Sequence, residues 1–137
     1  MDRAEAVALL ASGTHTAKLA TANGDDPHVA PVWFVVDGDD LVFTTGDRTI
    51  KGRHLRANPR AAVCVDVEVF PYTFVVVRGP VSLDPAPPDM LEWSTRIAAR
   101  YVPAERARWY GERNAVPGEM LCRLRMERVI AESDIAL

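Results

Sequence analysis

Hydrophobic and polar residues alternate along several stretches of the chain, with the period of two that is typical of β-strands. In the clearest stretch, residues 119–130, hydrophobic side chains at every second position alternate with mostly charged ones. Stretches of this kind, or runs rich in β-branched residues, predict six strands, at residues 14–21, 28–36, 41–45, 61–69, 73–83 and 119–130. Pro31 falls within the second strand, so we expect an edge, a bulge or a strand start there. Gly79-Pro80 predicts a bend in the fifth.

Four further stretches carry helix signals, at residues 2–11, 50–58, 89–102 and 105–113. Asp2, Thr49 and Asp89 are the expected N-caps of the first three. Most strands are joined by turn signals such as Asn23-Gly24 and Asp37-Gly38 and not by helices. We therefore expect one mainly β domain over residues 1–137, an antiparallel, closed or nearly closed barrel with flanking helices.

The composition is that of an ordinary globular protein and argues against several function classes. Of the 137 residues, 48% are hydrophobic and 26% are charged, and the formal net charge of -3 argues against a general role in nucleic-acid binding. No apolar run reaches the roughly 20 residues of a membrane span, and the first residues do not form a signal peptide. Cys64 and Cys122 fall in predicted strands, so we expect free thiols in a reducing cytoplasm.

The stretch from Leu41 to Arg60 has the features of a phosphate-binding site. A strand is followed by a turn and a short basic helix, whose first N–H groups and positive dipole end are available to an anion. Nearby hydroxyls and cations are those of Thr44, Thr45, Thr49, Arg48, Lys51 and Arg53. The alternative is that a solvated basic helix simply follows an edge strand.

Other chemistry is not indicated by the sequence. There is no Ser-His-Asp grouping, P-loop or Gly-x-Gly-x-x-Gly motif, and the three histidines lie in separate elements without metal-ligand spacing. We therefore expect no metal site, and no catalytic residue or proton donor can be named. A redox cofactor would account for this pattern because the cofactor itself carries the hydride.

Within the same stretch, Phe43-Thr44-Thr45, Thr49-Ile50-Lys51 and Asn58-Pro59 resemble the split β-barrel flavin-binding family that includes pyridoxamine 5′-phosphate oxidase. The resemblance implies a six-stranded antiparallel split β-barrel and a homodimer, with the cofactor in a groove between the subunits. It also implies that Thr44, Thr45, Thr49 and Lys51 hold the cofactor phosphate. Ile50, and Ala30 or the adjacent Pro31, stand where the oxidases carry arginines, so these anchoring cations are missing.

Three further segments resemble more closely the actinobacterial branch that uses the deazaflavin coenzyme F-420: residues 31–34 (Pro-Val-Trp-Phe), 51–56 and 58–60. This resemblance implies that the deazaflavin ring lies over the backbone of the second strand and that arginines meet the phosphate and the carboxylates of the polyglutamate tail. The expected cofactor-binding residues are Ala30, Pro31, Val32, Thr44, Thr45, Arg48, Thr49, Ile50, Lys51, Arg53 and Arg56.

Three functions fit these observations. The first is an F-420-dependent reductase that transfers a hydride from reduced deazaflavin to a small conjugated or heterocyclic substrate. The second is an FMN-dependent oxidase or reductase with the same fold, and the third is a protein that binds flavin, deazaflavin or haem without turnover.

The late helices carry several arginines, which suggests a lid over an anionic ligand, unless these side chains are simply solvated; they are Arg96, Arg100, Arg106 and Arg108. The valine-rich strands at 61–69 and 73–81 would suit burial on both faces, as in a homodimer.

Overall fold

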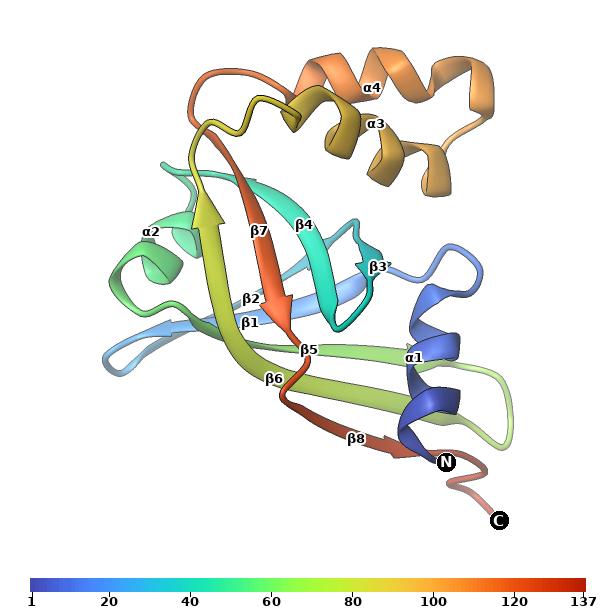
Figure 1. The fold of residues 1–137 in the computed structure, drawn as a ribbon. Coiled ribbons are helices and arrows are strands. Elements are labelled where there is room, and N and C mark those ends of the chain that lie inside the picture. The colour runs from blue at the N-terminus through green and yellow to red at the C-terminus, as the bar shows by residue number, and fades with distance from the viewer.

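Eight antiparallel strands form one sheet that curves around a hydrophobic core (Figure 1). The computed structural model describes residues 1–137. Neighbouring strands follow the order β2-β1-β5-β6-β7-β4-β3, and β8 pairs with β6. The strands are β1 (Ala17–Asn23), β2 (Asp26–Val32), β3 (Val35–Asp37), β4 (Asp40–Gly46), β5 (Arg60–Val67), β6 (Thr73–Asp84), β7 (Glu119–Arg125) and β8 (Arg128–Glu132). The antiparallel barrel is confirmed, whereas the predicted number of six strands is wrong.

One additional strand arises because the predicted strand at residues 28–36 is divided. β2 ends at Val32 and β3 begins at Val35. Between them the backbone of Phe34 bonds to a late helix: its N–H donates to the Tyr101 hydroxyl at 3.1 Å, and its carbonyl accepts from Arg100 at 2.8 Å. Phe34 is fully buried in the core. Pro31 lies, as expected, on a strand at the edge of the sheet, since β2 pairs only with β1.

The predicted strand at residues 119–130 is divided for a different reason. β6 bends at Gly79-Pro80, so its first half pairs with β8 and its second half with β7. A Cβ atom at residue 79 would overlap the carbonyl oxygen of Arg125, so glycine permits the close approach of the two chains at the bend. Between β7 and β8 the N–H of Met126 donates to Asp39 O at 2.9 Å, outside the sheet. The chain therefore forms two strands here, each paired with one half of the bent β6.

The helices are α1 (Arg3–Ala11), α2 (Ile50–Ala57), α3 (Met90–Tyr101) and α4 (Ala107–Asn114), with a short 3₁₀ turn, η1 (Ala104–Arg106), before α4. Asp2 and Thr49 cap α1 and α2 as predicted, by accepting from the N–H groups of Glu5 and Gly52. Asp89 occupies the N-cap position of α3 as predicted, but its carboxylate accepts from the indole N–H of Trp93 at 3.0 Å and from no backbone group of the helix. None of the helices has the length and apolar character needed to span a membrane.

Helix α1, helix α2 and the α3–α4 pair cover different parts of the barrel (Figure 1). Ala6 and Leu10 of α1 and Leu55 of α2 join the main core. The α3–α4 hairpin packs outside β4 and β7, where Val42, Met90, Ile97 and Leu121 form a second hydrophobic cluster. The second cluster and the main core therefore lie on opposite faces of the β4–β7 pair, and the hairpin is positioned to cover whatever binds there.

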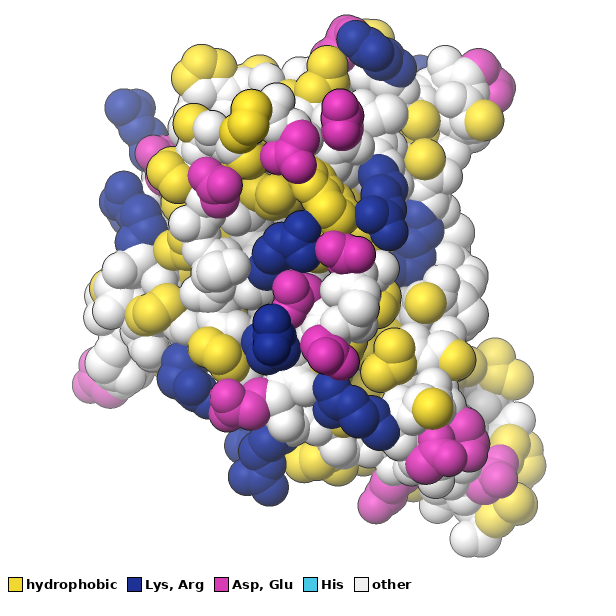
Figure 2. Space-filling model, viewed as in Figure 1, with side chains coloured by type: hydrophobic (Ala, Val, Ile, Leu, Met, Phe, Trp, Pro, Cys, Tyr) yellow, Lys and Arg dark blue, Asp and Glu magenta, His cyan; other side chains and the backbone are white.

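A network of ion pairs lies beside this second cluster. Arg123 on β7 donates to Asp37 at 3.0 Å and to Asp40 at 3.3 Å, and Arg125 donates to Asp40 at 2.9 Å. Figure 2 shows basic and acidic side chains alternating down the middle of this face. The Arg123 guanidinium also lies 4.8 Å from the ring centroid of Trp93, so the network contacts α3 as well as the sheet.

Candidate functional site

Two adjoining cavities lie at the end of β4, where the predicted phosphate site was expected. The inner cavity, of about 260 Å³, lies between the end of β2, β4, the first turn of α2 and the α3–α4 hairpin. The outer cavity, of about 680 Å³, lies between residues 46–49 and 117–119. Glu119 lines both, so the two cavities share a wall. The inner cavity alone is smaller than the ~300 Å³ at which small-molecule pockets usually begin, whereas the outer one is within that range.

The N-terminus of α2 is held in place by two threonine hydroxyls. The Thr49 hydroxyl accepts from the N–H of Gly52 at 3.0 Å and donates to Gly46 O at 2.8 Å. The Thr45 hydroxyl lies 3.1 Å from it. A Cβ atom at residue 52 would overlap the carbonyl oxygen of Gly46, so only glycine lets the first turn of α2 pack against the end of β4. This packing places the neighbouring Lys51 on the wall of the inner cavity.

Six of the eleven expected cofactor-binding residues lie together around the two cavities. Pro31, Val32, Thr44 and Lys51 line the inner one, and Arg48 and Thr49 line the outer one. These residues come from β2, β4, the turn after it and α2, which are brought together only by the fold.

The other five expected residues line neither cavity. Ala30 is paired with the buried Leu19 and faces the barrel interior. Thr45 is 2% exposed and positions Thr49. Ile50 is exposed at the start of α2, and Arg53 and Arg56 are exposed further along it.

Glu119 is a site residue that sequence reasoning missed. It is the first residue of β7 and pairs in register with Gly46 of β4. Partial burial is the main influence on its carboxyl and raises the pKa. A hydrogen bond with Thr44 and the positive charge of Lys51 lower this pKa, whereas the negative charge of Asp47 raises it further. The sequence shows Glu119 only as one polar position in an alternating strand, because Gly46, Thr44 and Lys51 lie far from it along the chain and meet it only in the fold.

The late helices cover the inner cavity with uncharged side chains. Ser94, Ile97 and Asn114 line it, together with Trp33 from the link between β2 and β3. The hypothesis that Arg100 contacts an anionic ligand is wrong, because its guanidinium donates to the backbone carbonyls of Leu10, Ser12, Gly13 and Phe34 at 2.7–3.0 Å. Arg108 pairs with Glu112 on α4. None of the four arginines lines the inner cavity, which the hairpin covers with uncharged side chains.

This arrangement suits a ligand with an anionic and an aromatic part. Lys51, Arg48 and the first turn of α2 offer cations and N–H groups to a phosphate. Val32, Trp33 and Ile97 offer an apolar wall to a planar ring. No group of three or more His, Cys, Asp or Glu side chains is arranged to hold a metal ion. The residues present therefore fit a phosphate-bearing flavin or deazaflavin.

Solved structures similar to this one support the same class of fold. A conserved hypothetical protein from Mycobacterium tuberculosis is 20% identical, with a TM-score of 0.79 over 98% of this chain and 86% of that chain. A FAD-binding protein from Mesorhizobium loti is 21% identical, with a TM-score of 0.69 over 96% and 92%. An F420 reductase is 26% identical, with a TM-score of 0.68 over 89% and 94%.

Sequence comparison gives the family directly. No curated protein sequence matches the chain. The family model described as pyridoxamine 5′-phosphate oxidase matches residues 3–132, which is nearly the whole chain. This match agrees with the antiparallel split barrel. The chain therefore belongs to the pyridoxamine 5′-phosphate oxidase family.

Proposed function

We propose that this protein is an F-420-dependent reductase of small conjugated or heterocyclic compounds. The observation that carries the proposal is the lining of the inner cavity, which combines Lys51 and Thr44 with the apolar side chains of Trp33 and Ile97. A phosphate at Lys51 would direct an attached ring system along these apolar side chains. The likeness to an F420 reductase at 26% identity supports the choice of cofactor.

In this proposal each part of the site has a separate role. Lys51 and Arg48 bind the phosphate, and Pro31 and Val32 lie under the ring. The exposed Arg53 and Arg56 meet the carboxylates of the tail. When bound, the reduced deazaflavin supplies a hydride to an activated double bond. The α3–α4 hairpin excludes water from the ring, which favours transfer to the substrate over side reactions.

FMN is the second candidate cofactor. It is favoured by the family match and by the likeness to a FAD-binding protein. It is disfavoured by Pro31, which lines the inner cavity beside Ala30, and by the exposed Ile50, because the oxidases that the chain resembles carry anchoring arginines at these places. A protein that binds the cofactor without turnover would use the same cavities. Only an assay of cofactor oxidation by an acceptor distinguishes it from the two enzymes.

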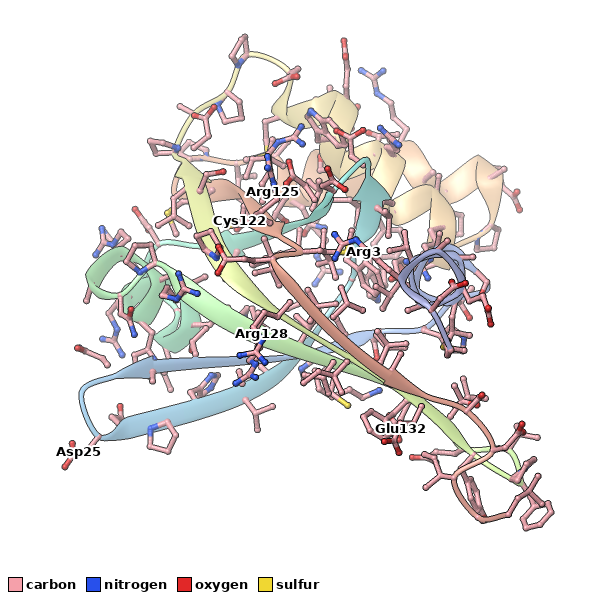
Figure 3. The ribbon with its side chains drawn as sticks, turned by 60° about the horizontal axis from the view of Figure 1, so that its bottom comes forward. Arg3, Asp25, Cys122, Arg125, Arg128 and Glu132 are labelled. Carbon is pink, nitrogen blue, oxygen red and sulfur yellow. The ribbon has the colours of Figure 1, made fainter.

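We also propose that a second copy of the chain covers the outer face of β1, β2, β5, β6 and β8. The strand registers place three rows of side chains on this face. The middle row is Pro31, Lys18, Cys64, Val76 and Ile130. Arg60, Arg78 and Arg128 surround a hollow of about 490 Å³ at one end, and Asp66 and Glu132 lie at the other. Figure 3 shows Arg128 and Glu132 at opposite ends of β8.

The charges on this face are complementary to the same face of another copy. Arg78 and Arg128 are directly opposed across β6 and β8, an arrangement of like charges that costs stability. Neither takes part in an ion pair within the chain. A two-fold axis through the middle row would lay the basic end of one copy over the acidic end of its partner. This pairing supports the homodimer.

The reductase proposal is tested by mixing the protein with reduced F-420 and an acceptor, and following reoxidation of the cofactor. The acceptors are 2-cyclohexen-1-one as a conjugated enone and menadione as a quinone. We expect oxidation of bound F-420 and formation of the saturated or hydroquinone product. Tight binding of F-420 without oxidation by any acceptor would favour the binding protein, and turnover with FMN alone would favour the oxidase.

A further inference from the structure

We propose that Glu119 is the proton donor of this reaction and that it carries protons from the outer cavity to the substrate in the inner cavity. The inference rests on the proposed reductase function and adds to it a catalytic residue. It also gives the outer cavity a role, as the route by which the acid is recharged from water.

The position of Glu119 is the first support. It forms part of the wall of both cavities, so a rotation of one side chain exposes its carboxyl to either side. Its carboxyl lies beside the backbone of Gly46, its partner in the sheet, where a Cβ atom would be 3.6 Å from Glu119 Oε1, an ordinary contact distance. On the inner side the carboxyl shares the cavity with Lys51 and Thr44, which hold the cofactor in the proposed function.

The charges around Glu119 come from several elements. Lys51 of α2 favours the carboxylate, and Asp47 in the turn before α2 favours the acid. Arg48 lines the outer cavity, and the neighbouring Cys122 on β7 is buried and neutral, with burial raising its pKa to about 12. The covering helices contribute only the uncharged Ser94 and Asn114. Partial burial is the largest influence and raises the pKa of Glu119, which keeps more of the acid form near neutral pH.

Lys51 shares the inner cavity but binds the cofactor phosphate in the proposed function, and the other candidate acids lie elsewhere. Glu119 is the only carboxyl group that lines the inner cavity, since Asp47 lines only the outer one. The Tyr101 hydroxyl donates to His15 O at 2.8 Å and accepts from the N–H of Phe34. His54 is held between Thr21 and Asp26, at 3.0 and 3.2 Å, away from the cavities.

With a conjugated enone, a hydride and a proton add across the carbon–carbon double bond. The β-carbon gains the hydride from reduced F-420, and the electron pair of the carbon–carbon π bond moves toward the carbonyl. The O–H bond of Glu119 breaks as its proton forms the new C–H bond at the α-carbon. The enone is reduced, and the deazaflavin is oxidised. The Glu119 carboxylate then takes a proton from water in the outer cavity.

The test compares the wild type with Glu119→Gln and Glu119→Asp, with Glu105→Gln as the matched control. Glu105 is exposed in η1 and lines neither cavity. Single-turnover oxidation of reduced F-420 by 2-cyclohexen-1-one is measured against pH, and F-420 affinity is measured separately. Circular dichroism checks the fold of each variant. Isotope-edited infrared spectra of the cofactor-free protein follow the protonated carboxyl directly.

We expect Glu119→Gln to slow the single turnover on the order of 10²-fold or more, the usual contribution of a general acid. F-420 affinity should be unchanged or higher, because the variant removes a negative charge near the phosphate site. The wild-type rate should fall as pH rises and the carboxyl ionises, and Glu119→Gln should lose this dependence. Glu119→Asp should recover part of the rate. In the wild type, the infrared band of a protonated carboxyl should persist at pH values above those at which glutamic acid ordinarily ionises. This band should be absent in Glu119→Gln.

A wild-type rate and pH profile in Glu119→Gln would overturn the role of Glu119 and leave the reductase proposal standing. Equal losses of rate and F-420 affinity would also overturn it, because they indicate a structural role. If the wild type binds F-420 but oxidises none of it, the reductase proposal fails, and the catalytic role of Glu119 fails with it. The infrared result then still reports whether the carboxyl holds its proton.

Discussion

At the scale of single residues, the sequence identified the cations of the site but not its acid. Lys51 and Thr44 were predicted from a local motif and line the inner cavity. Thr45 was predicted from the same motif, yet strand alternation turns it to the barrel interior. Glu119 was missed because its role depends on the register between β4 and β7, which no local pattern encodes.

The raised pKa of Glu119 predicts a pH-dependent difference in stability between the wild type and Glu119→Gln. The folded wild type binds this proton more tightly than the unfolded chain does, so its unfolding free energy should fall as pH rises from the unfolded value of about 4.3 through the higher folded value. At pH values above that range, the difference in unfolding free energy between the two proteins should be constant. Urea unfolding of both proteins at several pH values measures this difference. A difference that grows more favourable to the wild type over this range would contradict the assignment.

At the scale of elements, hairpins were predictable and strand breaks were not. The turns after Asn23 and Asp37 follow from their Asn-Gly and Asp-Gly signals, and Gly24 and Gly38 have positive φ angles as those turns require. The break after Val32 depends on Arg100 and Tyr101, which bond to Phe34 from a distant helix. Likewise, β7 and β8 separate because β6 bends. Contacts remote in sequence decide both breaks.

Arg100 is predicted to hold the α3–α4 hairpin on the barrel. Arg100→Ala should lower the unfolding free energy because four backbone carbonyls lose their donor. One hydrogen bond to a charged group contributes about 1.5–3 kcal/mol, so we expect a loss of this size or larger. Chemical denaturation measures the loss. The control is Arg96→Ala, since Arg96 is exposed on the same helix and stacks on Trp93. Equal stability losses in the two variants would show that Arg100 is not the anchor.

At the scale of the whole molecule, the sequence resemblance implied a dimer, and the outer sheet face suggests where the second copy binds. A standard interface covers about 800 Å² of each partner, roughly a tenth of the 7602 Å² surface of this chain. The alternating burial of β5 and β6 leaves Cys64 and Val76 only partly buried in the single chain. The valine-rich sequences of these strands predict that both faces of the strands are buried. Burial of the outer face, which carries Cys64 and Val76, therefore requires a partner.

Val76→Asp is predicted to break the proposed dimer. A carboxylate in the middle row of the face would be desolvated against the partner, a cost that the apolar valine does not carry. Light scattering should give the wild type about twice the 15.1 kDa mass of one chain and the variant the mass of a single chain. Ala99→Asp, on the exposed side of α3, is the control and should remain dimeric. A monomeric wild type, or a folded dimeric Val76→Asp, would rule out this face.

The central claim is that the cavity beside Lys51 holds the phosphate of F-420, and fluorescence titration tests it most directly. The wild type, Lys51→Ala and the control Arg108→Ala, an exposed α4 residue, are each titrated with F-420 and with FMN. We predict tight wild-type binding of F-420 and weak binding of FMN, and a loss of about 1.5–3 kcal/mol of F-420 binding free energy in Lys51→Ala alone. Unchanged F-420 affinity in Lys51→Ala would contradict the site, and tighter binding of FMN than of F-420 would contradict the cofactor.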